Sequence, residues 1–125
     1  MIQVAVFDDN KSRRESLETM IKLSNDFSFY GSYENGSYFE DDFQKNPPQV
    51  VLMDIEMPEV NGIEAIKIIK IKWPKILTVV QTAFDDDEKV FAALKAGAEG
   101  YILKSASVSS ILQAIDEVLN GGASM

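Results

Sequence analysis

Cysteine and histidine are both absent from this chain of 125 residues. The lack of cysteine excludes disulfide bonds, zinc thiolate sites and cysteine nucleophiles. The lack of histidine excludes a Ser-His-Asp triad and imidazole metal ligands. Any catalytic or metal-binding chemistry must therefore use carboxylates, hydroxyls, lysines and backbone groups.

Basic charge and long apolar runs are also scarce. Lys and Arg number 12 against 20 Asp and Glu, which gives a net charge of −8. Binding to nucleic acid or to an anionic membrane depends on basic side chains that neutralise phosphates, and the sequence has no basic stripe of that kind. No stretch approaches the roughly 20 apolar residues that span a bilayer. We therefore expect a cytoplasmic protein that binds neither DNA nor membranes directly.

Strand-like and helix-like patterns alternate along the chain, of which 46% is apolar. A chain of this size forms one domain and can bury about two-thirds of its unfolded surface. Repeated βα units predict an α/β fold with a parallel sheet, right-handed crossovers and helices on both faces. The segment 27–32 alternates apolar and polar residues, which predicts an edge strand. The predicted strands are 2–7, 27–32, 49–54, 76–81 and 100–103, and the predicted helices are about 10–24, 37–44, 62–72, 85–97 and 107–119.

Sequence signals mark the ends and the buried faces of the helices. Asn10 and Ser107 are suitable N-caps, and Asp85 with Glu88 resembles a capping box. Gly97 is suited to end the fourth helix. The last helix has the clearest apolar face, which we expect to contain Val108, Ile111, Leu112, Ile115, Val118 and Leu119.

Polar side chains follow four of the predicted strands. These are Asp8 and Asp9 after the first, Asp54 at the end of the third, Thr82 after the fourth and Lys104 after the fifth. Because the carboxyl ends of parallel strands meet at one edge of a sheet, where open α/β proteins bind ligands, we expect these side chains to gather there. Each residue alone has an ordinary explanation, such as a helix cap, a solvated turn or a solvated lysine. Their joint placement favours a functional site.

Carboxylates with one hydroxyl and one lysine suit a hard cation and a phosphoryl group. Mg²⁺ is typically held by one or two carboxylates together with substrate oxygens and waters. Asp8 and Asp9 could hold such an ion, and Asp54 could join them or act as a nucleophile that forms an acyl phosphate. Lys104 and the Thr82 hydroxyl could donate to the charge on the phosphoryl oxygens. Without a cation, the three carboxylates would repel one another.

Several motifs of this chain occur in the same order in one known family. They are Asp8-Asp9, Asp54 with Met57-Pro58 and Gly62, Thr82-Ala83, and Gly97-Ala98-Glu99-Gly100-Tyr101 ahead of Lys104. This set closely resembles the receiver domain of two-component response regulators, and the resemblance extends from about Ile2 to Leu119. It implies a flavodoxin-like (βα)5 fold, a doubly wound parallel sheet with strand order 2-1-3-4-5. It also implies that residues 1–125 form a single receiver domain.

The resemblance implies transfer of a phosphoryl group to Asp54 from a histidine of a sensor kinase or of a histidine phosphotransfer protein. The cofactor would be Mg²⁺ or Mn²⁺, held by Asp8, Asp9, Asp54 and the main-chain carbonyl of Glu56. Lys104 would pair with the phosphoryl oxygens. Thr82 and Tyr101 would be the switch pair, the hydroxyl moving toward the phosphoryl group and the ring turning inward. Such a domain is no enzyme for other substrates, since it catalyses only its own phosphorylation and dephosphorylation.

One position departs from the usual pattern of the family, because Ser105 rather than proline follows Lys104. We do not assume a cis peptide bond between them, since a cis bond before a non-proline residue costs about 2.5–4 kcal/mol. The form Gly-Tyr-Ile-Leu-Lys-Ser is more similar to the branch whose second half is a LuxR-type helix-turn-helix domain. We expect that DNA-binding half to lie outside this chain, which stops about where a linker would begin. A homodimer that depends on phosphorylation is a further partner that the resemblance allows.

Three other functions remain open at this point. A haloacid-dehalogenase-like phosphatase also uses an aspartate nucleophile and Mg²⁺, but its nucleophile follows the first strand rather than the third. A flavodoxin must cradle a flavin phosphate in its first loop, where Asp8 and Asp9 would repel it. A scaffold of the same fold that works without phosphorylation is disfavoured because every residue needed for phosphorylation is present.

Two residues beside the predicted site lead to a hypothesis about how long a phosphoryl group would last. Phe84 offers an apolar side chain that could cover the group, and Glu56 adds negative charge that would discourage an attacking hydroxide. We therefore expect slow self-dephosphorylation, unless both side chains point into solvent.

Overall fold

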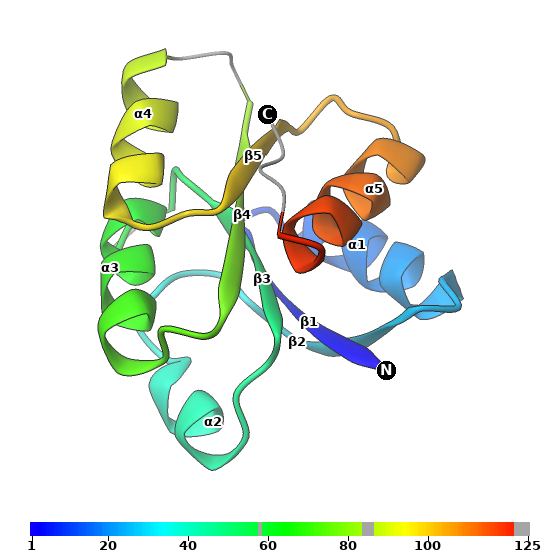
Figure 1. The fold of residues 1–125 in the computed structure, drawn as a ribbon, viewed down its shortest axis with the longest axis horizontal. Helices are drawn as coiled ribbons and strands as arrows, with labels where there is room; N and C mark the ends of the chain where they lie inside the picture. The colour runs from blue at the N-terminus through cyan, green and yellow to red at the C-terminus, as the bar shows by residue number, and fades with distance from the viewer. Residues whose placement is uncertain (58, 84–86, 122–125) are drawn as a thin grey trace.

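The computed structural model describes residues 1–57, 59–83 and 87–121. Five strands form one sheet in the order β2-β1-β3-β4-β5, and every neighbouring pair is parallel (Figure 1). The strands are β1 Ile2–Phe7, β2 Phe27–Tyr33, β3 Val50–Asp54, β4 Leu77–Thr82 and β5 Gly100–Leu103. The predicted fold and strand order are confirmed, and β2 lies at an edge as its alternating pattern predicted.

Five helices in the described residues cover the two faces of the sheet (Figure 1). They are α1 Lys11–Leu23, α2 Glu40–Lys45, α3 Gly62–Lys72, α4 Asp87–Ala96 and α5 Val108–Leu119. Buried residues of α1 and α5 pack on one face, and those of α2, α3 and α4 pack on the other. Among the described residues, no helix combines the length and the apolar character needed to cross a bilayer.

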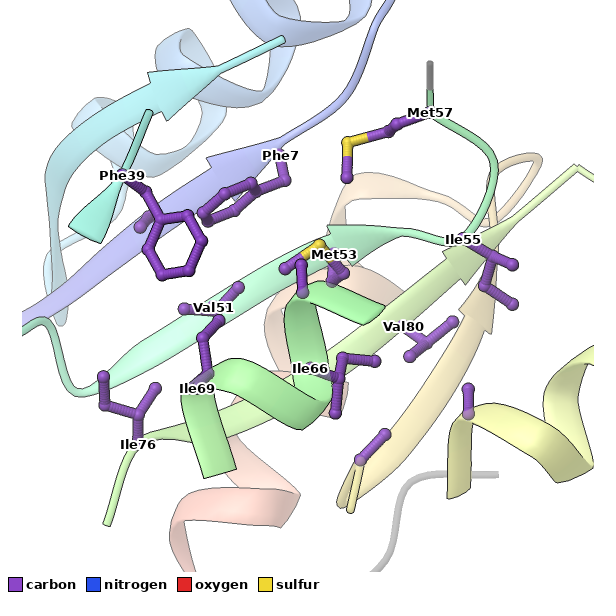
Figure 2. Packing of buried hydrophobic residues seen from close by; sticks show 14 of the residues in the cluster. Phe7, Phe39, Val51, Met53, Ile55, Met57, Ile66, Ile69, Ile76 and Val80 are labelled. Atoms are coloured by element: carbon purple, nitrogen blue, oxygen red, sulfur yellow. The ribbon is translucent and has the colours of Figure 1, made fainter. Parts of the chain in front are cut away.

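The two layers of core follow from the alternation of side chains along each strand. In β1, Ala5 and Phe7 point into the layer under α2, α3 and α4, whereas Val4 and Val6 point into the layer under α1 and α5. Figure 2 shows the first of these layers, in which α3 packs its isoleucines on the apolar side chains of β3. The central strands β1, β3 and β4 are therefore largely buried on both faces, and within β4 this burial includes the polar side chains of Thr78 and Gln81.

Side-chain capping explains where α1 and α5 begin. Asn10 and Ser107 are N-caps as predicted, because their side chains accept the N–H groups of Arg13 and Ser110. The predicted start of α2 at residue 37 was wrong, since this helix begins at Glu40. Asn35 accepts the N–H of Ser37 at 2.8 Å, and such a local turn competes with helix formation. Asp85, the predicted capping residue of α4, lies outside the described residues.

The predicted apolar face of α5 was too wide. Ile111, Ile115 and Val118 are buried, but Val108 is 56% exposed. At about 100° per residue, Val108 lies about 60° from Ile111, on the edge of the buried stripe that faces α1. Leu112 falls on the same edge and is only partly buried.

Candidate functional site

Asp54 ends the most deeply buried strand of the sheet. All five residues of β3 are buried, and only 2% of Asp54 is exposed. The following loop folds back so that the Gly62 N–H donates to the carbonyl of Ile55 at 3.0 Å. A Cβ atom at position 62 would lie 2.1 Å from the carbonyl oxygen of Asp54, so only glycine fits there. The Glu56 N–H donates to Asp54 Oδ1 at 3.1 Å, which orients the carboxylate.

The ends of β1 and β3 bring three carboxylates together. Asp8, Asp9 and Asp54 each offer one oxygen, and these oxygens lie within 4.8 Å of one another. Asp8 is fully buried and Asp9 is exposed. Asp8 Oδ1 accepts the N–H of Asn10 at 2.9 Å, so the residue that caps α1 also orients this carboxylate.

Lys104 lies between two of these carboxylates. Its Nζ is 3.0 Å from Asp54 Oδ2 and 3.1 Å from Asp8 Oδ2. Only the contact with Asp54 has the geometry of a hydrogen bond, and Asp8 Oδ2 has no hydrogen-bond partner within the described residues. One ammonium therefore faces two buried carboxylates and leaves one buried oxygen without a donor.

Burial and charge shift the ionisation of the central pair. Burial raises the pKa of Asp54 to about 6, the hydrogen bond and charge of Lys104 oppose this rise, and the charge of Asp8 adds to it. Burial alone would lower the pKa of Lys104, but its hydrogen bond with Asp54 and the nearby carboxylate charges outweigh that effect and raise it. Asp54 is therefore mostly ionised at pH 7, with Lys104 charged beside it.

The acidic cluster fits a hard divalent cation. Ligand oxygens around one octahedral Mg²⁺ lie about 3–4 Å apart, so the three carboxylate oxygens need only small shifts to share an ion. Asp8 Oδ2 forms an ion pair with Lys104 but accepts no hydrogen bond from the described residues, so it is a buried negative oxygen that a bound cation would satisfy. Lys104 alone offsets only part of the charge of the three carboxylates. The donor set contains no sulfur or imidazole, which favours Mg²⁺ or Mn²⁺ over softer metals.

Thr82 and Tyr101 lie on neighbouring strands beside this cluster. Thr82 ends β4 with 4% of its surface exposed, and its carbonyl accepts the N–H of Lys104 at 2.8 Å. Tyr101 is opposite Val80 in the sheet and packs partly buried against the core under α3 and α4. Because side chains alternate along a strand, Thr82 points to the same face as Val80. The two predicted switch residues thus occupy one face of adjacent strands.

Glu56 extends from the loop after β3 toward helix α4. Its carboxylate forms an ion pair with Lys89 in the first part of that helix. The predicted role of its main-chain carbonyl as a metal ligand stays a prediction. Phe84, the other residue expected to influence the lifetime of a phosphoryl group, lies outside the described residues.

Two arginines at the site were not predicted from the sequence. Arg14 donates to the carbonyl of Asp8 at 2.8 Å, and Arg13 donates to the carbonyl of Lys104 at 2.9 Å and to Gln81 Oε1 at 2.7 Å. The available signals were two adjacent arginines one turn after the acidic pair and a glutamine inside an apolar strand. The peptide bond between Lys104 and Ser105 is trans.

Comparison with known proteins agrees with this geometry. A family model described as the response regulator receiver domain matches residues 4–116. The transcriptional regulatory protein DegU of Brevibacillus brevis is 34% identical over 122 residues, which cover 98% of this chain and 52% of that protein. This chain therefore spans about half the length of the curated relatives that it matches.

Solved structures give the same result for the fold. A two-component response regulator of the LuxR family from Aurantimonas sp. SI85-9A1 has a TM-score of 0.91 at 24% identity, covering 98% of this chain and 88% of that one. A DNA-binding response regulator of the LuxR family from Staphylococcus aureus has a TM-score of 0.87 at 26% identity, covering 94% of this chain and 98% of that one. These matches confirm the resemblance seen in the sequence, including its LuxR-type branch, and disfavour the phosphatase and the flavodoxin.

Proposed function

This chain belongs to the response regulator receiver domains, the signalling domains of two-component systems, and we propose that Asp54 is its phosphoacceptor. The observation that carries the proposal is the position of Asp54 at a buried strand end, 3.0 Å from the ammonium of Lys104 and within the acidic cluster. A carboxylate that is buried, ionised and faced by a cation is suited to attack phosphorus rather than to stabilise the core.

In the proposed reaction, an oxygen of Asp54 attacks the phosphorus of a phosphohistidine on a sensor kinase or a histidine phosphotransfer protein. The new P–O bond forms as the P–N bond breaks, and the imidazole keeps the electron pair and takes a proton. Lys104 donates to the phosphoryl oxygens and moves part of its contact from Asp54 to the phosphate. The hydroxyl of Thr82 supplies a second donor. The domain catalyses only its own phosphorylation and dephosphorylation.

Receiver domains bind Mg²⁺ in an acidic pocket, and the cluster of this chain is of that kind. We assign the metal to Asp8, Asp9, Asp54 and the main-chain carbonyl of Glu56. Bound Mg²⁺ or Mn²⁺ offsets the negative charge of the incoming phosphoryl group. Asp8 contributes the buried oxygen that accepts no hydrogen bond from the described residues, and Asp9 is the exposed ligand at the entrance.

The phosphoryl group acts through Thr82 and Tyr101 on the surface formed by α4, β5 and α5. The Thr82 hydroxyl turns toward the phosphoryl group and leaves room for the ring of Tyr101 to turn inward. The half-buried position of Tyr101 against the core, on the sheet face that Thr82 shares, supports this role. A phosphate that favours one of the two shifts the population of the whole pair.

Residues 1–125 form one receiver domain that controls a DNA-binding output domain, and through it transcription. The relatives named as transcriptional regulators and the LuxR-family structure support this role. The net charge of −8 argues that DNA is bound by the output domain and not by this one. Phosphorylation also promotes a homodimer through the altered surface.

Intact mass spectrometry tests the proposal directly. After incubation with acetyl phosphate and Mg²⁺, the protein should gain the mass of one phosphoryl group. Asp54→Ala should gain none, and excess EDTA should prevent the gain. The matched control is Asp116→Ala, which removes an exposed carboxylate on α5 and should be labelled like the wild type. Full labelling of Asp54→Ala would overturn the assignment.

A further inference from the structure

Arg13 links helix α1 to the ends of β4 and β5. Its half-buried side chain donates from Nη1 to the carbonyl of Lys104 at 2.9 Å and from Nη2 to Gln81 Oε1 at 2.7 Å. One planar guanidinium therefore connects two strand ends. A lysine presents a single point charge and cannot reproduce this pair of fixed directions.

Lys104 depends on such contacts because it lies just beyond the last strand. β5 ends at Leu103, so the next residue receives less support from the sheet. The N–H of Lys104 donates to the carbonyl of Thr82 at 2.8 Å, and its own carbonyl accepts from Arg13. The peptide groups on both sides of its Cα are thus held, and Arg13 supplies one of the two restraints. The long side chain starts from this fixed point and reaches Asp54.

Gln81 is an unexpected residue for its place in β4. It is fully buried, and it points to the same layer as Val79 because side chains alternate along the strand. Its Oε1 accepts from Arg13, but its Nε2 has no hydrogen-bond partner within the described residues. A buried amide with an unpaired donor destabilises a core relative to an apolar side chain of similar volume. Gln81 is therefore better explained by the acceptor that it offers to Arg13 than by packing.

We propose that Arg13, oriented by Gln81, is a positioning residue that fixes the backbone of Lys104 so that its ammonium reaches the phosphoryl oxygens on Asp54. This inference rests on the proposed roles of Asp54 and Lys104. Among the described residues, the guanidinium of Arg13 donates to Lys104 and Gln81 and to none of the three aspartates, so it acts on the site through the lysine. Loss of either hydrogen bond of its guanidinium should therefore have the same effect as a partial loss of Lys104.

Variants of the two partners test the inference in the intact domain. The rate of phosphorylation by acetyl phosphate at saturating Mg²⁺ should fall roughly tenfold in Arg13→Met and in Gln81→Met, because a misplacement of about 1 Å can cost about a hundredfold and losing one of two restraints should displace Lys104 by less. Arg13→Lys should be nearly as slow, since charge alone does not bridge the two acceptors. The matched control is Lys11→Met, which removes one positive charge from an exposed position in the same helical turn and should react like the wild type.

Two further readouts separate positioning from a general structural role. Mg²⁺ affinity by calorimetry should stay within about twofold of the wild type in Arg13→Met, whereas the ¹³C shift of the Lys104 carbonyl should change even without metal. Combining Arg13→Met with Lys104→Met should be no slower than Lys104→Met alone. The inference would be overturned if Arg13→Met slowed the Lys104→Met protein by as much as it slows the wild type. It would also be overturned if the fall in Mg²⁺ affinity matched the fall in rate.

The outcomes distinguish failure of this inference from failure of the proposed function. If Lys104→Met and Asp54→Ala are phosphorylated like the wild type, the proposed function is wrong. If Lys104→Met is slow but Arg13→Met and Gln81→Met are normal, only the positioning role is wrong. Should Arg13→Met not fold, Gln81→Met decides the question, because it keeps the side-chain volume and replaces a poorly satisfied amide.

Discussion

Replacing Asp54 by asparagine in the metal-free protein should raise the free energy of unfolding, and the gain should grow with pH. The carboxyl is buried beside Asp8, which raises its pKa to about 6, while an aspartate in the unfolded chain ionises near pH 3.9. Between these two values the native state holds a proton that the unfolded state has lost. The contribution of the protonated Asp54 carboxyl to the free energy of unfolding is therefore fully present below about pH 4 and is lost as the pH rises through about 6.

The size of the effect follows from the shift in the pKa of Asp54. A rise of about two pH units corresponds to about 3 kcal/mol of lost stability once the carboxyl is ionised in both states. The opposing effect of Lys104 is already contained in the value of about 6. About half of this loss is present at pH 5. The difference between Asp54→Asn and the wild type should therefore grow by about 1.4 kcal/mol between pH 5 and pH 8.

Urea unfolding followed by tryptophan fluorescence measures this difference. Trp73 is the single tryptophan and packs against Phe39 and Phe43, so its emission reports loss of the core. The experiment is done in EDTA at constant ionic strength, with Asp116→Asn as the control for loss of an exposed carboxylate. Parallel pH curves for the wild type and Asp54→Asn, or a gain that shrinks with pH, would refute the explanation of the raised pKa.

Three other variants test separate parts of the site. Asp9→Ala should weaken Mg²⁺ binding in calorimetry while the metal-free melting temperature stays equal or rises, because one of three repelling carboxylates is removed; a large fall in that temperature would show a structural role. Thr82→Ala should accept the phosphoryl group but lose the amide shifts that phosphorylation causes near Lys104; unchanged shifts would show that the response takes another route. Gly62→Ala should lower the free energy of unfolding by more than about 2 kcal/mol in chemical denaturation, because its Cβ would lie 2.1 Å from a backbone oxygen; a near-neutral variant would contradict that loop geometry.

The fold could be predicted from the sequence, and so could the convergence of Asp8, Asp9, Asp54 and Lys104. The fold and this convergence both follow from simple rules. Alternating βα patterns specify a parallel sheet, and a parallel sheet brings its strand ends together. The proximity of these side chains therefore required only that each strand end be placed correctly. The structure brings Asp8, Asp9 and Asp54 within 4.8 Å and places Lys104 against two of them.

The features that were missed depend on tertiary contacts rather than local patterns. The helical pattern predicts Arg13 as an exposed residue of an amphipathic helix. Only the assembled sheet places its guanidinium at Gln81 and Lys104. The start of α2 was predicted too early because the turn at Asn35 competes with the helix. Val108 was assigned to the buried face because periodicity does not show how wide that face is.

Mapping the phosphoryl group to a residue tests the central claim most directly. Borohydride reduces an aspartyl phosphate to homoserine, so the protein is phosphorylated with acetyl phosphate and Mg²⁺, reduced, digested and sequenced by mass spectrometry. The account predicts homoserine at position 54 alone, and none when EDTA is present during phosphorylation. Homoserine at Asp8 or Asp9, or equal conversion of Asp54 without a divalent cation, would contradict it.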